Sequence, residues 1–333
     1  MIRRKVASLG LLFVAVAICL GGVGRVFAAT TTSTTQGSGN ALKVSPVRSD
    51  AEVNPGTSKV FDVYVQNLSG NTANLQAIVN DFVANKDESG TPSIILNSNQ
   101  AAPTHSLKQF VTPIPNFTLQ PNEQKDVKVT VTVPKNVAPG GYYGAVRFAP
   151  AAASADQSVT LSGSVGSLVL IKVPGNIKES VNIASFDVRK GDSVKTFFTS
   201  GKDLQAVVRF QNNGDVQEEP FGKVLVKKGG QTLATYEINN TSPRGNVLPS
   251  SIRRFSMNLS KVGSFGKYTI VGNFGYGTNG QLLTASKTIY VVPISVFVIV
   301  GIAIVALLLI IFVVPRMVKG YNRRVVRKAT SKK

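Results

Sequence analysis

The chain has a single cysteine, Cys19, and it lies in the apolar N-terminal segment. The rest of the 333-residue chain therefore cannot form an internal disulfide. A secreted eukaryotic receptor of this size would usually be cross-linked. We infer a bacterial cell surface and domains large enough to fold on their apolar cores alone. Lipidation of Cys19 is disfavoured, because Ile18 is bulkier than the small residue that usually precedes a lipidated cysteine.

The residues of most catalytic and metal sites are also scarce. The one histidine, His105, lies in a proline-rich loop, where a lone imidazole can form neither a zinc site nor a supported Ser-His-Asp triad. The acid pairs Asp87-Glu88 and Glu218-Glu219 would point to opposite faces of a strand, so neither predicts a carboxylate dyad. A calcium site using Asp81, Asp87 and Glu88 lacks a glycine-spaced acidic loop. We predict a non-enzymatic protein with no catalytic residues, no metal and no cofactor.

Long apolar runs occur only at the two ends of the chain. At the N-terminus, basic residues 3–5 precede an uncharged run, Val6 to Gly24, and small residues at Val26 and Ala28 suit cleavage. We predict a signal peptide at 1–28, with an uncleaved signal anchor as the alternative. A polar, Thr/Ser-rich stalk follows at 29–40.

The C-terminal run, Pro293 to Val314, carries no charge and one polar side chain, Ser295. At 1.5 Å per residue it would extend about 33 Å, enough for a hydrocarbon core of about 30 Å. Residues 315–333 hold eight basic residues and no acid. The positive-inside rule places this tail in the cytoplasm and the N-terminal ectodomain outside. We predict a single-pass cell-membrane protein with a transmembrane helix at 293–314, which makes the lipid bilayer a partner.

Net charge is +20, but much of it belongs to these ends. Four basic residues lie in the signal segment and eight in the tail, which leaves 25 basic and 17 acidic residues between them. This surplus does not indicate nucleic-acid binding, although it suits an anionic wall polymer or membrane surface. The pairs Lys227-Lys228 and Arg253-Arg254 could contact such a polymer, or else are solvated charges at strand edges.

Between the ends, the pattern is all-β. Residues 126–133 alternate, with four valines facing one side, and 166–173 form an almost continuous apolar run expected to be buried on both faces. Short strands separated by turn residues are typical of tandem Ig-like β-sandwiches. Further strands are predicted at 59–65, 142–148, 204–210, 222–226, 232–238, 255–259, 268–274 and 285–292.

A faint internal repeat divides this region. A strand ending at Asn67 is followed later by Leu119-Gln120-Pro121, and a strand ending at Asn212-Asn213 is followed by Val247-Leu248-Pro249. Two related sandwiches would produce this pattern. We place the first sandwich at 41–176 and the second at 177–292. The long loops 97–116, 150–158 and 239–245 are candidate locations for binding.

Several short motifs follow one another along the predicted ectodomain. They are Pro46-Val47-Arg48, Asn54-Pro55-Gly56, Val65-Gln66-Asn67, Leu119-Gln120-Pro121, Val127 to Pro134 and Pro139-Gly140-Gly141-Tyr142-Tyr143-Gly144. In order and spacing these motifs resemble those of the WxL-interacting surface proteins. The resemblance implies an N-terminal Ig-like domain linked to peptidoglycan binding, a second sandwich linked to host or matrix binding, and a transmembrane helix with a basic tail.

Within the last motif, we take Gly140, Gly141, Tyr142 and Tyr143 as candidate binding residues. The glycines also suit a positive-φ turn after Pro139. The predicted function is binding of cell-wall peptidoglycan, of another surface protein, or of a host or matrix protein. The alternative is a chaperone-like secretion or assembly accessory that adds a partner strand to a sheet edge. An exposed edge strand would favour that alternative.

Overall fold

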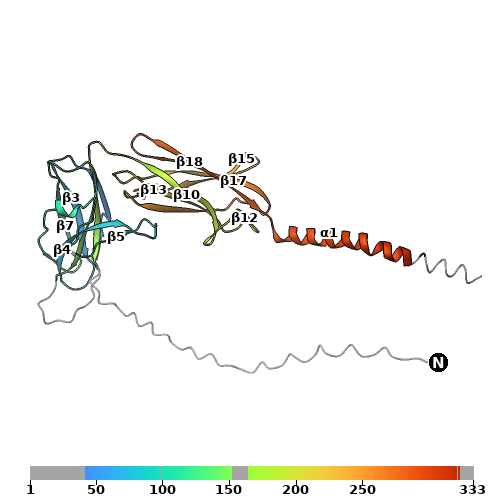
Figure 1. Cartoon of the computed structure of the whole chain (residues 1–333). Helices are drawn as coiled ribbons and strands as arrows, with labels where there is room; N and C mark the ends of the chain where they lie inside the picture. Colours follow the sequence, from blue (N-terminus) through green and yellow to red (C-terminus); the bar gives the residue numbers. More distant parts are fainter. Residues whose placement is uncertain (1–41, 98, 152–163, 321, 323–333) are drawn as a thin grey trace, which may run out of the picture. The chain divides into compact units, whose positions relative to one another are not determined.

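The computed structural model describes residues 42–97, 99–151, 164–320 and 322. These residues form two β-sandwiches followed by one long helix (Figure 1). The predicted fold class is confirmed: the chain is mostly β, with several sheets and, among the described residues, one apolar C-terminal helix. The predicted signal peptide, the stalk, residues 152–158 of one predicted loop and residues 323–333 of the tail lie outside the described residues.

The first sandwich consists of two sheets with mainly antiparallel pairing. One sheet has the strand order β1-β3-β7, and the other has the order β2-β9-β8-β4-β5 with β6 paired to β4. Strand β2 runs parallel to β9. The elements are β1 (Leu42–Ser45), β2 (Arg48–Glu52), β3 (Ser58–Asn67), β4 (Ala73–Ala84), β5 (Pro92–Ile94), the 3₁₀ turn η1 (Lys108–Phe110), β6 (Phe117–Leu119), β7 (Gln124–Thr132), β8 (Gly140–Pro150) and β9 (Val165–Val173).

Alternation along β3 and β7 separates a buried face from an exposed one. Val63 pairs with Val127 and Phe61 with Val129, and all four side chains are buried in the core between the sheets. Successive residues of a strand point to opposite sides, so the residues between them face outward. This is the valine pattern that the sequence predicted for residues 126–133.

The second sandwich has its own core and two sheets, ordered β11-β10-β13-β16 and β12-β18-β17-β14-β15. Phe210 and Phe274 meet edge-to-face in this core, with ring centroids 5.0 Å apart. The strands are β10 (Val181–Lys190), β11 (Ser193–Val194), β12 (Phe197–Phe198), β13 (Leu204–Asn212), β14 (Phe221–Lys228), β15 (Gln231–Ile238), β16 (Ile252–Leu259), β17 (Gly266–Tyr276) and β18 (Gln281–Val291).

Strand β9 is buried on both faces, as its continuous apolar run predicted. Val169 and Ile171 face the core of the first sandwich. Leu170 faces the other way and packs in a smaller cluster with Phe82 and Tyr143. Leu248 of the second sandwich packs against this cluster, so the outer face of the β9 sheet contacts the second sandwich.

Helix α1 (Ile294–Phe312) follows β18 after two residues. Its 19 residues extend about 28 Å. A further helical segment continues it, so that Ile294–Gly320 is long and apolar enough to cross a membrane by length and composition. None of the residues of α1 is buried against the rest of the chain.

Candidate functional site

The outward side of the β1-β3-β7 sheet is a polar, largely exposed surface on the first sandwich. It is formed by the residues of β3 and β7 that alternate with the core valines, and we call it the β3–β7 face. Over the six residue steps from Ser58 to Tyr64, β3 extends about 20 Å. Such a surface suits an extended polymer better than a small molecule. Its residues are Ser58, Val60, Asp62, Tyr64, Asp126, Lys128, Thr130 and Thr132.

Tyr64 gives this face an aromatic contact group. Its side chain is 41% exposed, and it is the one exposed aromatic residue among residues 50–97 and 99–150. An aromatic ring with a polar hydroxyl can stack on an apolar ring face and donate a hydrogen bond at its edge. The aromatics of β8 are instead half-buried or buried, which restricts their access to a polymer.

Three charged side chains lie together beside Tyr64. The ammonium of Lys128 donates to Asp126 Oδ2 at 2.5 Å and to Asp62 Oδ1 at 2.6 Å. These hydrogen bonds, first the one to Asp126 and then the one to Asp62, raise the pKa of Lys128. The group is exposed, so it contributes little to stability. It does provide a fixed set of donors and acceptors for hydroxyl, amide or charged groups of a ligand.

The sequence motif that suggested Gly140 to Tyr143 lies elsewhere, where β8 meets the second sandwich. The amide of Gly141 donates to the Asp215 carbonyl at 2.8 Å. The buried Tyr143 donates from its hydroxyl to Gln217 Oε1 at 2.9 Å. Gly140 has a φ of +141°, and a Cβ there would lie 3.0 Å from the Asp215 carbonyl oxygen. The motif therefore has a structural role in joining the sandwiches.

Tyr142 is the member of the motif that remains partly accessible. It is half-buried, packs on Phe110 with ring centroids 5.0 Å apart, and donates to the Ala138 carbonyl at 2.8 Å. Burial raises the pKa of its hydroxyl. His105, which lies in the predicted proline-rich loop, is half-buried, and its Nδ1 lies 2.6 Å from the Gly141 carbonyl oxygen.

Ion pairs connect the two sandwiches at this junction. Arg48 of the first sandwich lies 2.7 Å from a Glu219 carboxylate oxygen of the second. Glu88, in the β4–β5 turn, forms a two-bond pair with Arg209, whose Nε donates to Oε2 at 2.7 Å. The hydrogen bonds from Arg209 lower the pKa of Glu88. One member of each acid pair, Glu88 or Glu219, thus serves a contact between the sandwiches.

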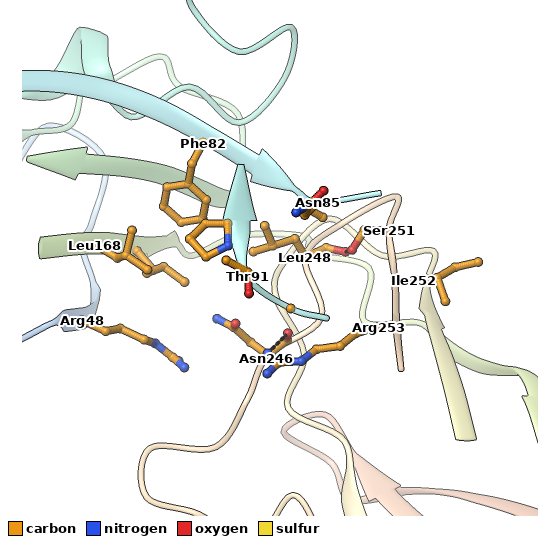
Figure 2. A pocket seen from close by; sticks show the side chains of 14 residues that line it. Arg48, Phe82, Asn85, Thr91, Leu168, Asn246, Leu248, Ser251, Ile252 and Arg253 are labelled. Carbon is orange, nitrogen blue, oxygen red and sulfur yellow. Dashed lines mark hydrogen bonds between the residues drawn. The ribbon is translucent and has the colours of Figure 1, made fainter. Parts of the chain in front are cut away.

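A narrow cavity lies at the same junction (Figure 2). Phe82 and Leu168 contribute from the first sandwich, and Leu248 and Arg253 from the second. About 40 Å³ is open to water-sized molecules, so the cavity has room for a few waters and none for a sugar ring. The prediction that Arg253 is a solvated edge charge is wrong: its guanidinium packs against Gly90 and donates to the Asn246 carbonyl at 2.8 Å.

The acids considered for calcium are not assembled around a common point. Asp81 is fully buried, and its carboxylate accepts from the amides of Ala102 and Lys108, both at 2.9 Å. Glu88 is paired with Arg209. Within the part of the chain that the structure describes, no three His, Cys, Asp or Glu side chains are grouped as metal ligands.

Sequence reasoning did not select Tyr64. The signal was present in residues 59–65, KVFDVYV, where Phe61, Val63 and Val65 alternate with polar or exposed positions. Period-two alternation with Val63 inward places Tyr64 outward. The candidate residues of β8 came from the family resemblance, and the structure shows what surrounds their glycines: a Cβ would meet the Asp215 carbonyl at Gly140 and the Tyr143 hydroxyl at Gly141.

Comparison with solved structures finds weak similarity to fimbrial chaperones. The class 5 fimbriae chaperone CfaA is 14% identical, with 74% of this chain and 99% of that chain covered and a TM-score of 0.39. The E. coli chaperone DraB is 16% identical, with coverages of 74% and 98% and a TM-score of 0.33. A search of the curated proteins finds no matching sequence.

A family model gives the more specific result. Residues 50–150 match the WxL Interacting Protein, peptidoglycan binding domain. The matched segment begins in β2 and ends with β8, so it includes both strands of the β3–β7 face and the motif at 140–143. The resemblance inferred from the short motifs is thereby confirmed: residues 50–150 are similar to the peptidoglycan-binding domain of the WxL-interacting proteins.

Proposed function

We propose that this chain is a non-catalytic, membrane-anchored cell-surface protein whose first sandwich binds peptidoglycan. The match of residues 50–150 to a peptidoglycan-binding domain is the observation that carries the proposal. Helix α1 provides a segment able to span a bilayer, and the basic tail favours its cytoplasmic placement. A second surface protein, or a host or matrix protein, is a further partner proposed for the second sandwich.

The β3–β7 face is the proposed contact surface for the polymer. All eight of its residues fall within the matched segment. It presents an exposed aromatic ring, hydroxyl groups and a charged cluster on a sheet, which together suit sugar rings and the short peptides of the wall.

An open groove beside residues 174–180, which connect the two sandwiches, is a weaker candidate. Its volume is about 500 Å³, but Glu52 is the only one of its lining residues within the matched segment, and no aromatic ring lines it.

Co-sedimentation with purified peptidoglycan sacculi tests this proposal. The full chain in detergent should remain bound at both low and high salt. Replacing Tyr64 by alanine should weaken binding about tenfold, as expected for loss of an aromatic contact at the centre of an interface. Leu68→Ala is the matched control, because Leu68 is 49% exposed on the same sandwich but lies outside the β3–β7 face.

The other outcomes are equally informative. Binding lost at high salt would reduce the interaction to charge attraction. Unchanged binding by Tyr64→Ala, with loss in Tyr142→Ala, would move the contact surface to the predicted 140–143 motif. No binding at either salt would refute peptidoglycan binding by this chain.

The alternative function, strand addition to a sheet edge, has one specific observation in its favour. Strand β15 ends its sheet, pairs only with β14 in the sheet order, and carries one charged side chain, Glu237. Charges are one device that protects native edge strands, and β15 has few of them, although the register shift opposite Val226 and Lys227 gives it a bulge, which is another such device. A partner strand added there would protect the amides of β15 from hydrogen exchange and would leave the β3–β7 face unaffected. Exchange protection confined to β15 would therefore identify strand addition.

A further inference from the structure

One end of the second sandwich lies close to the start of α1. Strand β18 ends at Val291 and α1 begins at Ile294, so two residues connect them. Two extended residues span about 7 Å. The amide of Val292 also donates to the Phe198 carbonyl at 2.8 Å, which ties the connection to β12. If α1 spans the bilayer, this end of the sandwich must be at the membrane surface.

We call this end the membrane-proximal end and define it as residues 190–203, 228–231 and 260–267. Strand pairing brings these segments to the level of Val291. Gly266 pairs with Val291, and Phe197 pairs with Tyr290. Lys227 pairs with Thr269, so the β14–β15 turn that follows it lies at the same end.

Two aromatic side chains project into solvent there. Phe197 is 67% exposed and stacks on Tyr290, with ring centroids 5.1 Å apart and an interplanar angle of 17°. Phe265 is 58% exposed in the β16–β17 loop. That loop is held in place, because the Phe265 carbonyl accepts from Lys228 Nζ at 3.0 Å and from the Tyr268 hydroxyl at 3.2 Å. Exposed phenylalanines on fixed segments suggest a surface with a partner.

The charge of the membrane-proximal end identifies that partner. Its segments hold two aspartates, Asp192 and Asp203, against six exposed lysines: Lys190, Lys195, Lys202, Lys228, Lys261 and Lys267. The opposite end of the same sandwich has the reverse balance, with Glu179, Asp215, Glu218 and Glu219 against Lys178 and Arg244. Aromatic rings with lysines, next to a membrane helix, are the combination found at anionic bilayer surfaces.

We propose that the membrane-proximal end of the second sandwich docks on anionic lipid headgroups, with Phe197 and Phe265 in the interfacial layer and the lysines against the lipid charges. This inference rests on the membrane anchoring in the proposed function. Docking would fix the second sandwich on the bilayer and direct the first sandwich toward the wall. Continuity with α1 favours lipid over any other anionic surface, because the two-residue connection keeps the bilayer within reach at all times.

Single-tryptophan variants of the full chain provide the test, since the chain has no tryptophan of its own. Phe197→Trp and Phe265→Trp would be reconstituted in nanodiscs of phosphatidylglycerol and phosphatidylcholine containing lipids brominated high on the acyl chain. We expect strong bromine quenching of both. Leu282→Trp is the matched control: Leu282 is 82% exposed at the opposite end of β18, and its tryptophan should not be quenched.

Removal of charge gives a second readout. Lys195→Gln in the Phe197→Trp background should lower the docking equilibrium constant about fivefold, as expected for one lysine near an anionic surface. Pure phosphatidylcholine nanodiscs should weaken quenching further. Equal quenching at positions 197 and 282, or quenching that ignores lipid charge, would overturn the proposal.

Phe297→Trp, within α1, separates this inference from the anchoring on which it depends. Quenching at position 297 without quenching at 197 and 265 would refute docking and leave anchoring intact. Absence of quenching at position 297 would refute anchoring and docking together.

Discussion

Glu218 is an acid placed where its charge is poorly accommodated. The residue is 4% exposed, and its Oε2 accepts one hydrogen bond, from the Gly277 amide at 3.1 Å. Its Oε1 accepts no hydrogen bond from any residue that the structure describes. Burial, and then the neighbouring charge of Glu179, raise the pKa of Glu218 to about 7. The proton is therefore retained in the folded state at pH values where an exposed glutamate has lost it.

This raised pKa predicts a stability that falls as pH rises. The folded state keeps the Glu218 proton up to about pH 7, whereas the unfolded chain releases it near the usual value of 4.5. The contribution to stability is thus fully present below pH 4.5 and is lost as pH rises through about 7. Glu218→Gln should remove this loss and raise the free energy of unfolding at pH 8 by on the order of 3 kcal/mol. Urea unfolding at pH 5 and pH 8 measures it.

Glu219 supplies the neighbouring control. Its carboxylate pairs with Arg48 across the junction, so Glu219→Gln should reduce stability at pH 8 instead of increasing it. If Glu218→Gln and the wild-type chain lose the same free energy of unfolding between pH 5 and pH 8, the pKa assigned to Glu218 is wrong.

At the level of the element, each sandwich uses a buried asparagine to fasten a strand end to a distant loop. Asn67, at the end of β3, donates from Nδ2 to the Asn71 carbonyl at 2.7 Å and to the Gln120 carbonyl at 3.1 Å. Asn212, at the end of β13, donates to the Val216 carbonyl at 2.7 Å and to the Val247 carbonyl at 2.8 Å. The faint repeat in the sequence thus has a structural basis, since both asparagines bind the loop that precedes an X-Pro step.

Asn212→Ala should destabilise the second sandwich. The substitution leaves two buried carbonyls without Nδ2 and removes Oδ1, which accepts from the Gly214 amide at 2.8 Å. We expect a loss of about 2–4 kcal/mol in the free energy of unfolding. Asn213 provides the control, because its side chain is exposed and its bond to Asn182 is on the surface. Asn213→Ala should cost less than about 0.5 kcal/mol. Equal losses in the two variants would show that the asparagine contact is not what holds the loop.

Strand β4 shows where prediction from sequence fails at this scale. All ten strands predicted from alternation or apolar runs are present, but β4, with 12 residues, was not predicted. Asn80 and Asp81 interrupt its apolar pattern, and both are fully buried. Asn80 donates to the Ile95 carbonyl at 2.8 Å, and Asp81 binds amides of the same long loop. These partners are distant in sequence, so no local periodicity indicates that the polar residues are satisfied inside a sandwich.

The strands could be predicted from the sequence, but the surroundings of the candidate motif at 140–143 could not. Turn residues and alternation depend on local sterics, which a sequence displays directly. The glycine motif marked a place of close approach, but the approaching group, the Asp215 carbonyl, lies in the other sandwich. A glycine in a sequence indicates that another group can approach the backbone closely. It does not show whether that group belongs to a ligand or to the protein's own backbone.

For the whole molecule, the distribution of charge and the position of the long apolar helix suggest one order of the domains between the cell wall and the membrane. The sandwich that contains the segment matched to peptidoglycan binding comes first in the chain. The second sandwich, with its lysine-rich membrane-proximal end, comes next, and α1 follows it after two residues. This order would place wall-binding groups away from the bilayer and lysines beside it. The domain boundaries predicted at 41–176 and 177–292 agree with this division and stay a prediction.

The proposed orientation can be tested by labelling from one side of the membrane. In a Cys19→Ser background the chain has no cysteine, so Leu282→Cys reports on the ectodomain and Lys328→Cys on the tail. The positive-inside rule predicts that the basic tail stays in the cytoplasm. A membrane-impermeant maleimide should therefore label Leu282→Cys in intact cells and Lys328→Cys only after permeabilisation. Labelling of Lys328→Cys in intact cells would mean that α1 does not span the membrane in the proposed direction, and the docking of the lysine-rich end on the outer leaflet would then lose its basis.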